Sequence, residues 1–257
     1  SSDLDGSTFG TLTNSGGGSD CFIVKYNTTG TAQWATRIGG TYGIDFDSGT
    51  GIATDSNGNV YVTGYYYANP LTIYNYDGST FGTLSRTGSN SSDCFIVKYN
   101  TTGTAQWATR ISGSGSDQGT GIATDSNGNV YVTGYYTSNP LTIYNYDGST
   151  FGTLTISGGG NDCFIVKYNT TGTAQWATRI SGSNSTQGNG IATDSNGNVY
   201  VTGHYNSNPL TIYNYDGSTF GTLTNSGGGS DCFIVKYNTT GRSEEHTSEL
   251  QSRFGIS

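Results

Sequence analysis

The sequence predicts an all-β protein built from a repeat of about seventy residues. Residues 51–66 (Gly-Ile-Ala-Thr-Asp-Ser-Asn-Gly-Asn-Val-Tyr-Val-Thr-Gly-Tyr-Tyr) recur unchanged at 121–136 and with one change at 190–205. Each copy contains short runs of β-branched and aromatic residues bounded by turn residues, a pattern typical of strands. No segment shows the spacing of an amphipathic helix. A fixed repeat of short strands indicates a regular all-β array.

Two hairpins are predicted in each repeat. An Asn57-Gly58 turn within residues 55–59 joins a strand at 52–54 to one at 60–62, and Asn-Gly is a strong hairpin signal. Residues 27–30 join a strand at 21–26 to one at 32–38 in the same manner. Four antiparallel strands per repeat follow. The intervening segment, 71–74 and 81–84 around Asp77-Gly78, could add a third hairpin.

Four short strands and one tryptophan per repeat are typical of a β-propeller blade. A parallel β-helix, the competing array, uses shorter rungs and needs no antiparallel Asn-Gly hairpins. The chain holds two complete blades, half a blade at its start and most of another at its end. We therefore expect a partial β-propeller, an open arc rather than a closed ring, with uncovered apolar blade faces that favour aggregation or oligomerisation.

The repeat also resembles a known family. From Asp20 the chain reads Asp-Cys-Phe-Ile-Val-Lys-Tyr-Asn-x-x-Gly-x-x-x-Trp, and from Gly51 it reads Gly-Ile-Ala-Thr-Asp-Ser-Asn-Gly-Asn-Val-Tyr-Val-Thr-Gly. Both segments are similar to the bacterial-type β-propeller repeat family, whose repeats resemble those of seven-bladed propellers. The resemblance implies a secreted or cell-surface propeller without a shared catalytic site. The long 65–92 connection and the cysteine of the first motif depart from the family pattern.

The repeats end at Gly241. Glutamate occurs only after this residue, at 244, 245 and 249, and residues 242–257 resemble the in-frame translation of a sequencing adapter. Such segments are excluded from fold reasoning. We expect a propeller fragment over 1–241, with repeats at approximately 1–50 (partial), 51–120, 121–189 and 190–241 (partial), and a non-native tail over 242–257.

Composition excludes several classes of partner. Without residues 242–257 the chain holds eight Lys and Arg and fifteen Asp, a net charge of −7. A mildly acidic chain so poor in basic residues lacks the clustered positive charge that binds nucleic acid. No stretch approaches the roughly twenty apolar residues of a membrane span.

No catalytic or metal-binding constellation can be assembled from the sequence. His204, the one histidine before residue 242, replaces a tyrosine in a single repeat, and the aspartates are spread evenly over predicted turns, which favours solvated loops. Asp55-x-Asn57-Gly58 lacks the further acidic ligands of a calcium loop. We expect no enzyme activity and no cofactor.

The cysteines, tryptophans and tyrosines recur once or more per repeat. The cysteines favour small core residues over disulfides or a metal cluster; they are Cys21, Cys94, Cys163 and Cys232. The tryptophans (Trp34, Trp107 and Trp176) favour packing between blades over a carbohydrate surface, whereas both alternatives stay open for Tyr65, Tyr66 and Tyr67. Asn-x-Ser/Thr sites could be glycosylated in a secreted eukaryotic protein; they are Asn27, Asn90, Asn100, Asn169, Asn184 and Asn238.

Variation between repeats points to a binding face. It is confined to residues 39–50, 67–68 and 85–92 and their counterparts. Connections in an antiparallel meander alternate between the two ends of the strands, so all three stretches should lie at one end and the invariant turns at the other. Rigid scaffolds tend to place recognition on variable loops. The candidate ligand-binding residues there are Tyr42, Asp45, Asp47, Tyr67, Arg86, Asn90, Asp117, Gln118, Asn184 and Gln187.

The sequence therefore favours a non-catalytic extracellular or cell-surface scaffold that binds protein or glycan. A purely structural repeat or spacer is the main alternative. A fragment of a propeller lyase or glycosidase is a third hypothesis, and it would require catalytic residues outside this sequence.

Overall fold

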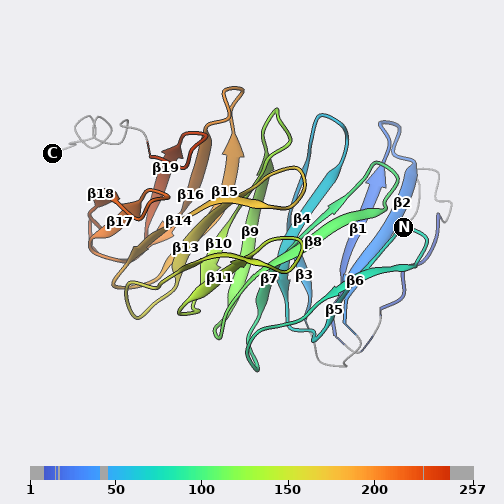
Figure 1. The fold of residues 1–257 in the computed structure, drawn as a ribbon, viewed down its shortest axis with the longest axis horizontal. Coiled ribbons are helices and arrows are strands. Elements are labelled where there is room, and N and C mark those ends of the chain that lie inside the picture. The colour runs from blue at the N-terminus through green and yellow to red at the C-terminus, as the bar shows by residue number, and fades with distance from the viewer. Residues whose placement is uncertain (1–8, 15, 17, 41–45, 228, 244–257) are drawn as a thin grey trace.

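The computed structural model describes residues 9–243 except 15, 17, 41–45 and 228, and this part of the chain is all β (Figure 1). Its strands are β1 (Cys21–Tyr26), β2 (Ala32–Gly39), β3 (Ser48–Thr54), β4 (Val60–Tyr66), β5 (Leu71–Tyr74), β6 (Thr80–Leu84), β7 (Asp93–Tyr99), β8 (Ala105–Ser112), β9 (Asp117–Thr124), β10 (Val130–Tyr136), β11 (Leu141–Tyr144), β12 (Thr150–Leu154), β13 (Asp162–Tyr168), β14 (Ala174–Gly182), β15 (Thr186–Thr193), β16 (Val199–Tyr205), β17 (Leu210–Tyr213), β18 (Thr219–Leu223) and β19 (Asp231–Tyr237). No helix in this part is long and apolar enough to cross a membrane.

Both predicted hairpins form. Thr54 pairs with Val60 across the 55–59 turn, and Tyr26 pairs with Ala32 across the 27–30 turn. Gly58 adopts φ 76°, a left-handed conformation that glycine reaches without the steric penalty of a Cβ. The Asn-Gly sequence therefore specifies the turn and, with it, the register of β3 and β4.

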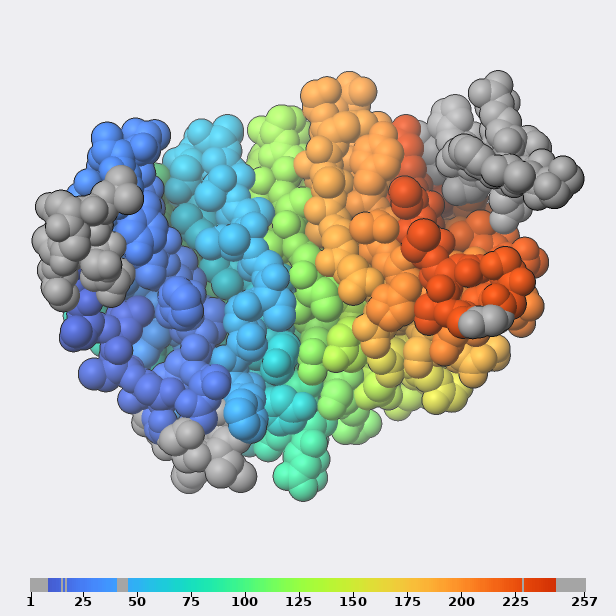
Figure 2. Space-filling model, turned by 180° about the vertical axis from the view of Figure 1, so that it is seen from behind, coloured from blue at the N-terminus to red at the C-terminus, as the bar shows by residue number. Residues whose placement is uncertain are grey.

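The strands form four sheets stacked face to face. Figure 2 shows successive segments of the chain side by side along the row, from blue to red. The two central sheets have six strands each, in the orders β3-β4-β7-β8-β11-β12 and β9-β10-β13-β14-β17-β18, and the outer sheets are β1-β2-β5-β6 and β15-β16-β19. The first four strands of each central sheet are the predicted blade. None of the sheets closes on itself, so the chain is an open array of propeller blades.

The middle segment of each repeat forms the third hairpin, and it joins the neighbouring sheet. β5 and β6 lie between β4 and β7 in sequence, yet β4 pairs directly with β7. β5 pairs instead with β2 of the preceding sheet, where Ile73 lies opposite Ile38, and both side chains are fully buried. Each repeat therefore extends the sheet built by the repeat before it.

Side chains of the blade strands alternate between two apolar interfaces. In β7, Phe95, Val97 and Tyr99 pack toward the preceding sheet, whereas Cys94 and Ile96 pack toward the following one. Strands covered on both faces need no polar side, which is why polar and apolar residues alternate so weakly in the sequence. The core is thus divided into apolar layers, one between each pair of successive sheets.

The tryptophans lie in these apolar layers between the sheets, as predicted. Trp34 packs on Tyr99 of the next sheet with ring centroids 6.2 Å apart. Its Nε1 donates a hydrogen bond to the carbonyl oxygen of Thr101 at 2.9 Å. The indole therefore joins successive blades through both its ring and its polar atom, and it is not available to a carbohydrate.

Candidate functional site

The invariant turns gather at one end of the strands. The β4–β7 register places the 55–59 turn beside the 100–103 turn. The Tyr76 N–H, in the turn of the third hairpin, donates to the carbonyl oxygen of Gly103 at 3.0 Å. In Figure 1 the β3–β4, β9–β10 and β15–β16 turns all project on the same side. This end is the same in every repeat.

The variable stretches lie together at the opposite end, as the strand count predicts. In the first central blade the Oγ1 of Thr87 lies 3.0 Å from the Oγ of Ser112, and in the second the Thr137 N–H donates to the Ser116 carbonyl at 2.9 Å. We call this surface the variable end. It comprises residues 67–68, 85–92, 112–116, 137–138, 155–161, 181–185, 206–207 and 224–227.

A tyrosine group lies where two blades meet at the variable end. The rings of Tyr65 and Tyr67 are 6.2 Å apart in an edge-to-face arrangement. Burial, with the neighbouring Tyr67 and Tyr65, raises the pKa of Tyr135 on the next blade, so these phenols lie within electrostatic reach of one another. All three side chains are partly exposed. Tyr66, by contrast, is fully buried and donates to the Ser85 carbonyl at 3.0 Å.

The third repeat lacks this aromatic group. His204 stands at the position of Tyr135, and its Nδ1 lies 2.9 Å from the Oδ1 of Asn189. Asn206 occupies the position of Tyr67. The aromatic surface is therefore a property of the first two central blades.

Two predicted contact residues have a different role from the one expected. Asp47 is buried and accepts the backbone N–H groups of Gly40, Tyr67 and Ala68 at 3.0 to 3.2 Å. Asp117 is buried too, and the Ser138 Oγ donates to it at 2.6 Å. Both carboxylates hold a variable loop from beneath and do not face a ligand. The expectation of solvated aspartates is wrong here because a loop-anchoring aspartate and a turn aspartate look alike in sequence.

Asp93 and Asp162 have the same anchoring role and were not among the residues predicted from the sequence. Both are fully buried, and each accepts a loop N–H, from Thr87 at 2.6 Å and from Ser157 at 2.9 Å. Burial raises the pKa of Asp93 to about 8; the Thr87 N–H opposes this and nearby Asp117 adds to it. The recurrence of an aspartate before every cysteine was the available signal. These carboxylates anchor the 85–92 and 155–161 loops.

The other predicted residues are scattered along the variable end. Arg86 is tied back by a 2.9 Å hydrogen bond to the Ser91 carbonyl, and Gln118 lies 3.3 Å from the Ser92 Oγ. Asn90 and Asn184 are exposed, and Asn90 has φ 63°. Gln187 is half-buried opposite His204 in the β15–β16 ladder. Tyr42 and Asp45 lie outside the described residues.

The Asp55 turn is held by its own hydrogen bonds. The Asp55 carboxylate accepts the N–H groups of Asn57 and Asn59, the Asn59 side-chain amide and the Tyr61 hydroxyl at 2.8 to 3.0 Å. Every acceptor site of this carboxylate that a calcium ion would use is thus engaged in turn formation. Among the described residues, no group of three or more His, Cys, Asp or Glu is placed to hold a metal ion.

The four cysteines are free thiols, and three of them are core residues as predicted. Cys21, Cys94 and Cys163 are buried, and burial raises the pKa of each thiol to about 12. Cys232 is exposed on the last sheet. None of the three buried thiols is a reactive nucleophile at neutral pH.

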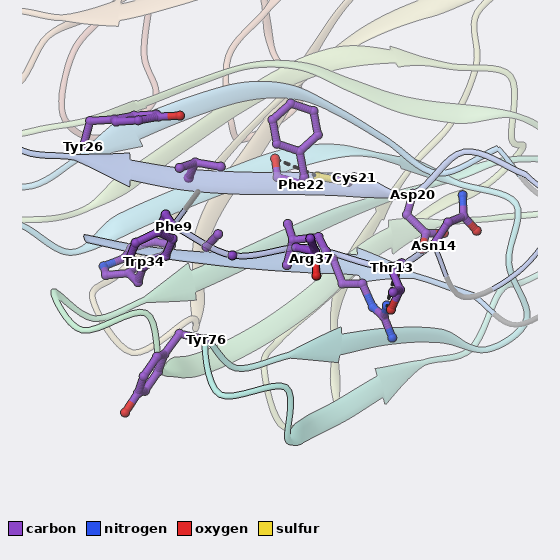
Figure 3. A pocket seen from close by; sticks show the side chains of 15 residues that line it. Phe9, Thr13, Asn14, Asp20, Cys21, Phe22, Tyr26, Trp34, Arg37 and Tyr76 are labelled. Carbon is purple, nitrogen blue, oxygen red and sulfur yellow. Dashed lines mark hydrogen bonds between the residues drawn. The ribbon is translucent and has the colours of Figure 1, made fainter. Parts of the chain in front are cut away.

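A cavity of about 570 Å³ lies on the outer face of the first sheet (Figure 3). Phe22, Tyr26, Trp34 and Tyr76 line it, with Phe9 in the segment that crosses over β2. In the central blades the counterparts of Phe22 and Tyr26 are buried under the preceding sheet. The cavity therefore lies where a central blade is covered by its preceding sheet, and Thr13, Asn14, Asp20 and Arg37 also line it.

Stacked four-stranded antiparallel blades with a constant and a variable end define a β-propeller repeat scaffold. Residues 33–70, 106–142 and 175–211 match the SBBP family, described as a beta-propeller repeat. The chain therefore contains three repeats that match this family. The first matched segment ends just before the third hairpin, and the other two end within its first strand, β11 or β17, which agrees with the long connection noted in the sequence.

Two curated relatives are much longer than this chain. An uncharacterized WD repeat-containing protein L264 of Acanthamoeba polyphaga mimivirus is 34% identical over 233 residues, covering 85% of this chain and 17% of that protein. The regulatory protein FlaEY of Caulobacter vibrioides is 28% identical over 159 residues, covering 62% and 15% respectively. The chain thus spans about a sixth of the relatives that it matches.

Solved structures are matched only weakly. A Bacteroides caccae protein of unknown function is 12% identical, over 69% of this chain and 81% of that chain, with a TM-score of 0.25. A similarity of this size carries no argument about the arrangement of the blades.

Proposed function

We propose that this chain is a non-catalytic extracellular or cell-surface scaffold that binds protein or glycan through its variable end. The observation that carries the proposal is the segregation of sequence variation. Every variable stretch in the described residues lies at one end of the blades, and the invariant turns lie at the other.

The construction of the variable end supports this proposal. Buried aspartates hold its loops from below through backbone N–H groups, so the exposed residues can change while the loop path stays fixed. A loop surface positioned by a rigid scaffold is a common way to build a recognition site. Loops that served only to connect strands would not need buried carboxylates, which are costly to desolvate.

The tyrosine group favours recognition over simple spacing. Tyrosine has a flat apolar ring and a polar hydroxyl, and it is enriched at binding surfaces for that reason. Tyr65, Tyr67 and Tyr135 expose such surface at the junction of two blades. Both a sugar ring and a protein side chain could stack there, so this group does not separate the two ligand classes.

Two alternatives remain. A spacer without a ligand is consistent with the near-identity of the repeats. A lyase or glycosidase would need catalytic residues that lie elsewhere, since the hydrogen bond of His204 goes to Asn189 and none joins it to a base or nucleophile among the described residues.

Paired tyrosine substitutions test the proposal. Tyr67 lies at the variable end and Tyr76 at the invariant end, where it is exposed. The chain and its Tyr67→Ser and Tyr76→Ser variants would be applied to a glycan array and to immobilised candidate extracellular proteins. We expect binding that Tyr67→Ser weakens about tenfold or more and Tyr76→Ser leaves unchanged. Equal loss with both variants would contradict a site at the variable end, and no binding by the parent chain would favour the spacer.

A further inference from the structure

A groove lies between the third hairpin of one sheet and the next sheet along the row. β12, the last strand of the first central sheet, lies beside β14 of the second. A cavity of about 420 Å³ opens between them, lined by Phe151 and Gly152 of β12, Gln175 and Arg179 of β14 and Tyr213 of β17. We call this cavity the outer groove. It shares no residue with the variable end.

The outer groove recurs along the chain. A cavity of about 270 Å³ on the first sheet is lined by Arg37 and Tyr74, which have the places of Arg179 and Tyr213 in their repeats. The junction between these two carries the same side chains, because residues 71–84 are identical to 141–154 and residues 105–111 are identical to 174–180. Within the described part of the chain, three successive junctions therefore present one set of groove residues.

The arginine of the groove is held in place by an aromatic ring. The guanidinium carbon of Arg179 lies 4.3 Å from the centre of the Tyr213 ring, and the two counterpart pairs are separated by 4.1 and 4.4 Å. A cation–π contact of this kind fixes the planar guanidinium group. Among the described residues, Arg179 donates only one long hydrogen bond, of 3.5 Å to the Thr155 hydroxyl. Its other terminal N–H groups are available to a ligand.

The opposite wall of the groove combines an exposed ring with an open glycine. Phe151 is 41% exposed. No heavy atom lies within 4 Å of a Cβ added at Gly152, and this residue does not adopt a left-handed φ, so neither packing nor backbone conformation requires glycine there. Glycine inside a strand lowers its stability and often marks a place where a ligand approaches closely. The counterparts Gly10 and Gly82 are equally open.

The polar groups of the groove suit an uncharged ligand that is rich in hydroxyls. Asp216 also lines the groove, and hydrogen bonds from Ser218 hold the pKa of its carboxyl below the usual range, so its negative charge balances that of Arg179. Gln175 is exposed and adds an amide. Planar groups that donate or accept in pairs match neighbouring hydroxyls of a sugar ring. The apolar C–H face of the same ring matches an exposed aromatic side chain such as Phe151.

We propose that the outer grooves bind a neutral saccharide. Its ring packs on Phe151, over the space left by Gly152, and its hydroxyls bond to Arg179, Gln175 and Asp216. The volume of the groove lies in the range of about 300 to 1,000 Å³ that is usual for small-molecule sites. Because the same groove recurs at successive junctions, a polysaccharide with repeating units engages several at once and gains avidity without any new kind of contact.

An extended peptide is the competing occupant, since the outer edge of β12 is unpaired among the described strands. β12 is five residues long and has Gly152 at its centre, and both features disfavour the addition of a further strand. Strand addition also relies on backbone groups. It would need neither the stacked Arg179 nor the open face of Gly152, whereas a saccharide uses both.

Binding of the full chain to immobilised polymers tests the proposal. The probes are four neutral polysaccharides (cellulose, chitin, mannan and galactan), acidic polygalacturonate and a library of unstructured peptides. We expect binding to a neutral polysaccharide that the combined variant Arg37→Gln, Arg110→Gln and Arg179→Gln weakens about tenfold or more. Asn57→Ser with Asn127→Ser is the control, because both side chains are exposed on invariant turns outside the grooves. Capture by polygalacturonate or peptides alone, or no capture, would overturn the proposal.

A second variant fills the grooves without removing any contact. Gly10→Thr, Gly82→Thr and Gly152→Thr together should leave the melting temperature unchanged or raise it, because the added Cβ atoms meet nothing and threonine favours strands. The same variant should weaken saccharide binding about tenfold or more, since the new side chains occupy the space of the sugar. Tyr67→Ser, at the variable end, should leave this binding unchanged. Binding that survives the glycine variant, or that Tyr67→Ser removes, would place the saccharide elsewhere and overturn the proposal.

Discussion

The indole nitrogen of Trp34 and the carbonyl oxygen of Thr101 form a hydrogen bond of 2.9 Å that joins two successive repeats. The same bond recurs from Trp107 to Thr170 and from Trp176 to Thr239. Each carbonyl also accepts a lysine Nζ from the same neighbouring blade at 3.1 Å. Stability of the array therefore depends on a contact between repeats as much as on the repeats themselves.

Trp107→Phe should destabilise the chain by about 1 to 3 kcal/mol, because it removes a buried hydrogen bond and part of a packed ring. The measurement is the urea midpoint, at matched protein concentration. Phe151→Leu is the control, since Phe151 is exposed and its replacement should change stability by less than about 0.5 kcal/mol. An unchanged midpoint in Trp107→Phe would show that the inter-blade bond contributes nothing.

The free energy of unfolding should fall as pH rises from about 4 to about 8. Burial raises the pKa of Asp93 to about 8 and that of Asp117 to about 7. Between the unfolded and folded pKa values the native state binds more protons than the unfolded state, so stability is lost as pH rises through this window. Asp93→Asn should flatten the profile of unfolding free energy against pH.

Asp77→Asn is the control for that experiment. Asp77 is exposed, and hydrogen bonds from Ser79 lower its pKa, so it titrates below the window in question. Its substitution should leave the slope between pH 4 and 8 unchanged. A slope that Asp93→Asn does not alter would assign the pH dependence to other groups.

One thiol per chain should react quickly with a disulfide reagent under native conditions. Cys232 is exposed, whereas the other three thiols are buried with pKa values raised to about 12. All four should react after unfolding in guanidinium. Cys232→Ser should remove the fast phase completely; a remaining fast thiol would mean that a blade interface opens on the timescale of the assay.

Gly64→Ala should destabilise the chain by about 2 kcal/mol or more. A Cβ at Gly64 would overlap the Ser48 carbonyl oxygen and lie 2.9 Å from the Phe95 ring, so the two strands or the ring must shift. Gly82→Ala is the matched control, because nothing lies within 4 Å of its added Cβ. Thermal unfolding compares the two directly, and equal melting temperatures would contradict the steric argument.

The repeat and its hairpins could be predicted from sequence because the information is local. Asn57-Gly58 demands a left-handed turn, and the turn sets the register of the strands on either side. The position of the β5–β6 hairpin could not be predicted this way. Its strands are only four and five residues long, and nothing local says which sheet edge receives them.

The variable end could be predicted as a location, since strand counting decides which connections share an end. Its individual residues could not. Asp47 and Asp117 lie in variable stretches, but their carboxylates point inward to backbone N–H groups, and only the fold reveals this. Tyr65 and Tyr135 gain their significance from lying within electrostatic reach of each other on two blades, an arrangement that no single repeat contains.

The placement of β5 and β6 on the preceding sheet has a mechanical consequence. Each repeat places its third hairpin in the sheet of the repeat before it, where Ile73 of β5 pairs with Ile38 of β2. A force that pulls the two ends of the row apart cannot peel away one sheet alone; it must also shear the hairpin that this sheet holds from the following repeat. At each junction the load is therefore carried by the backbone pairing of the hairpin as well as by the packed faces of the two sheets.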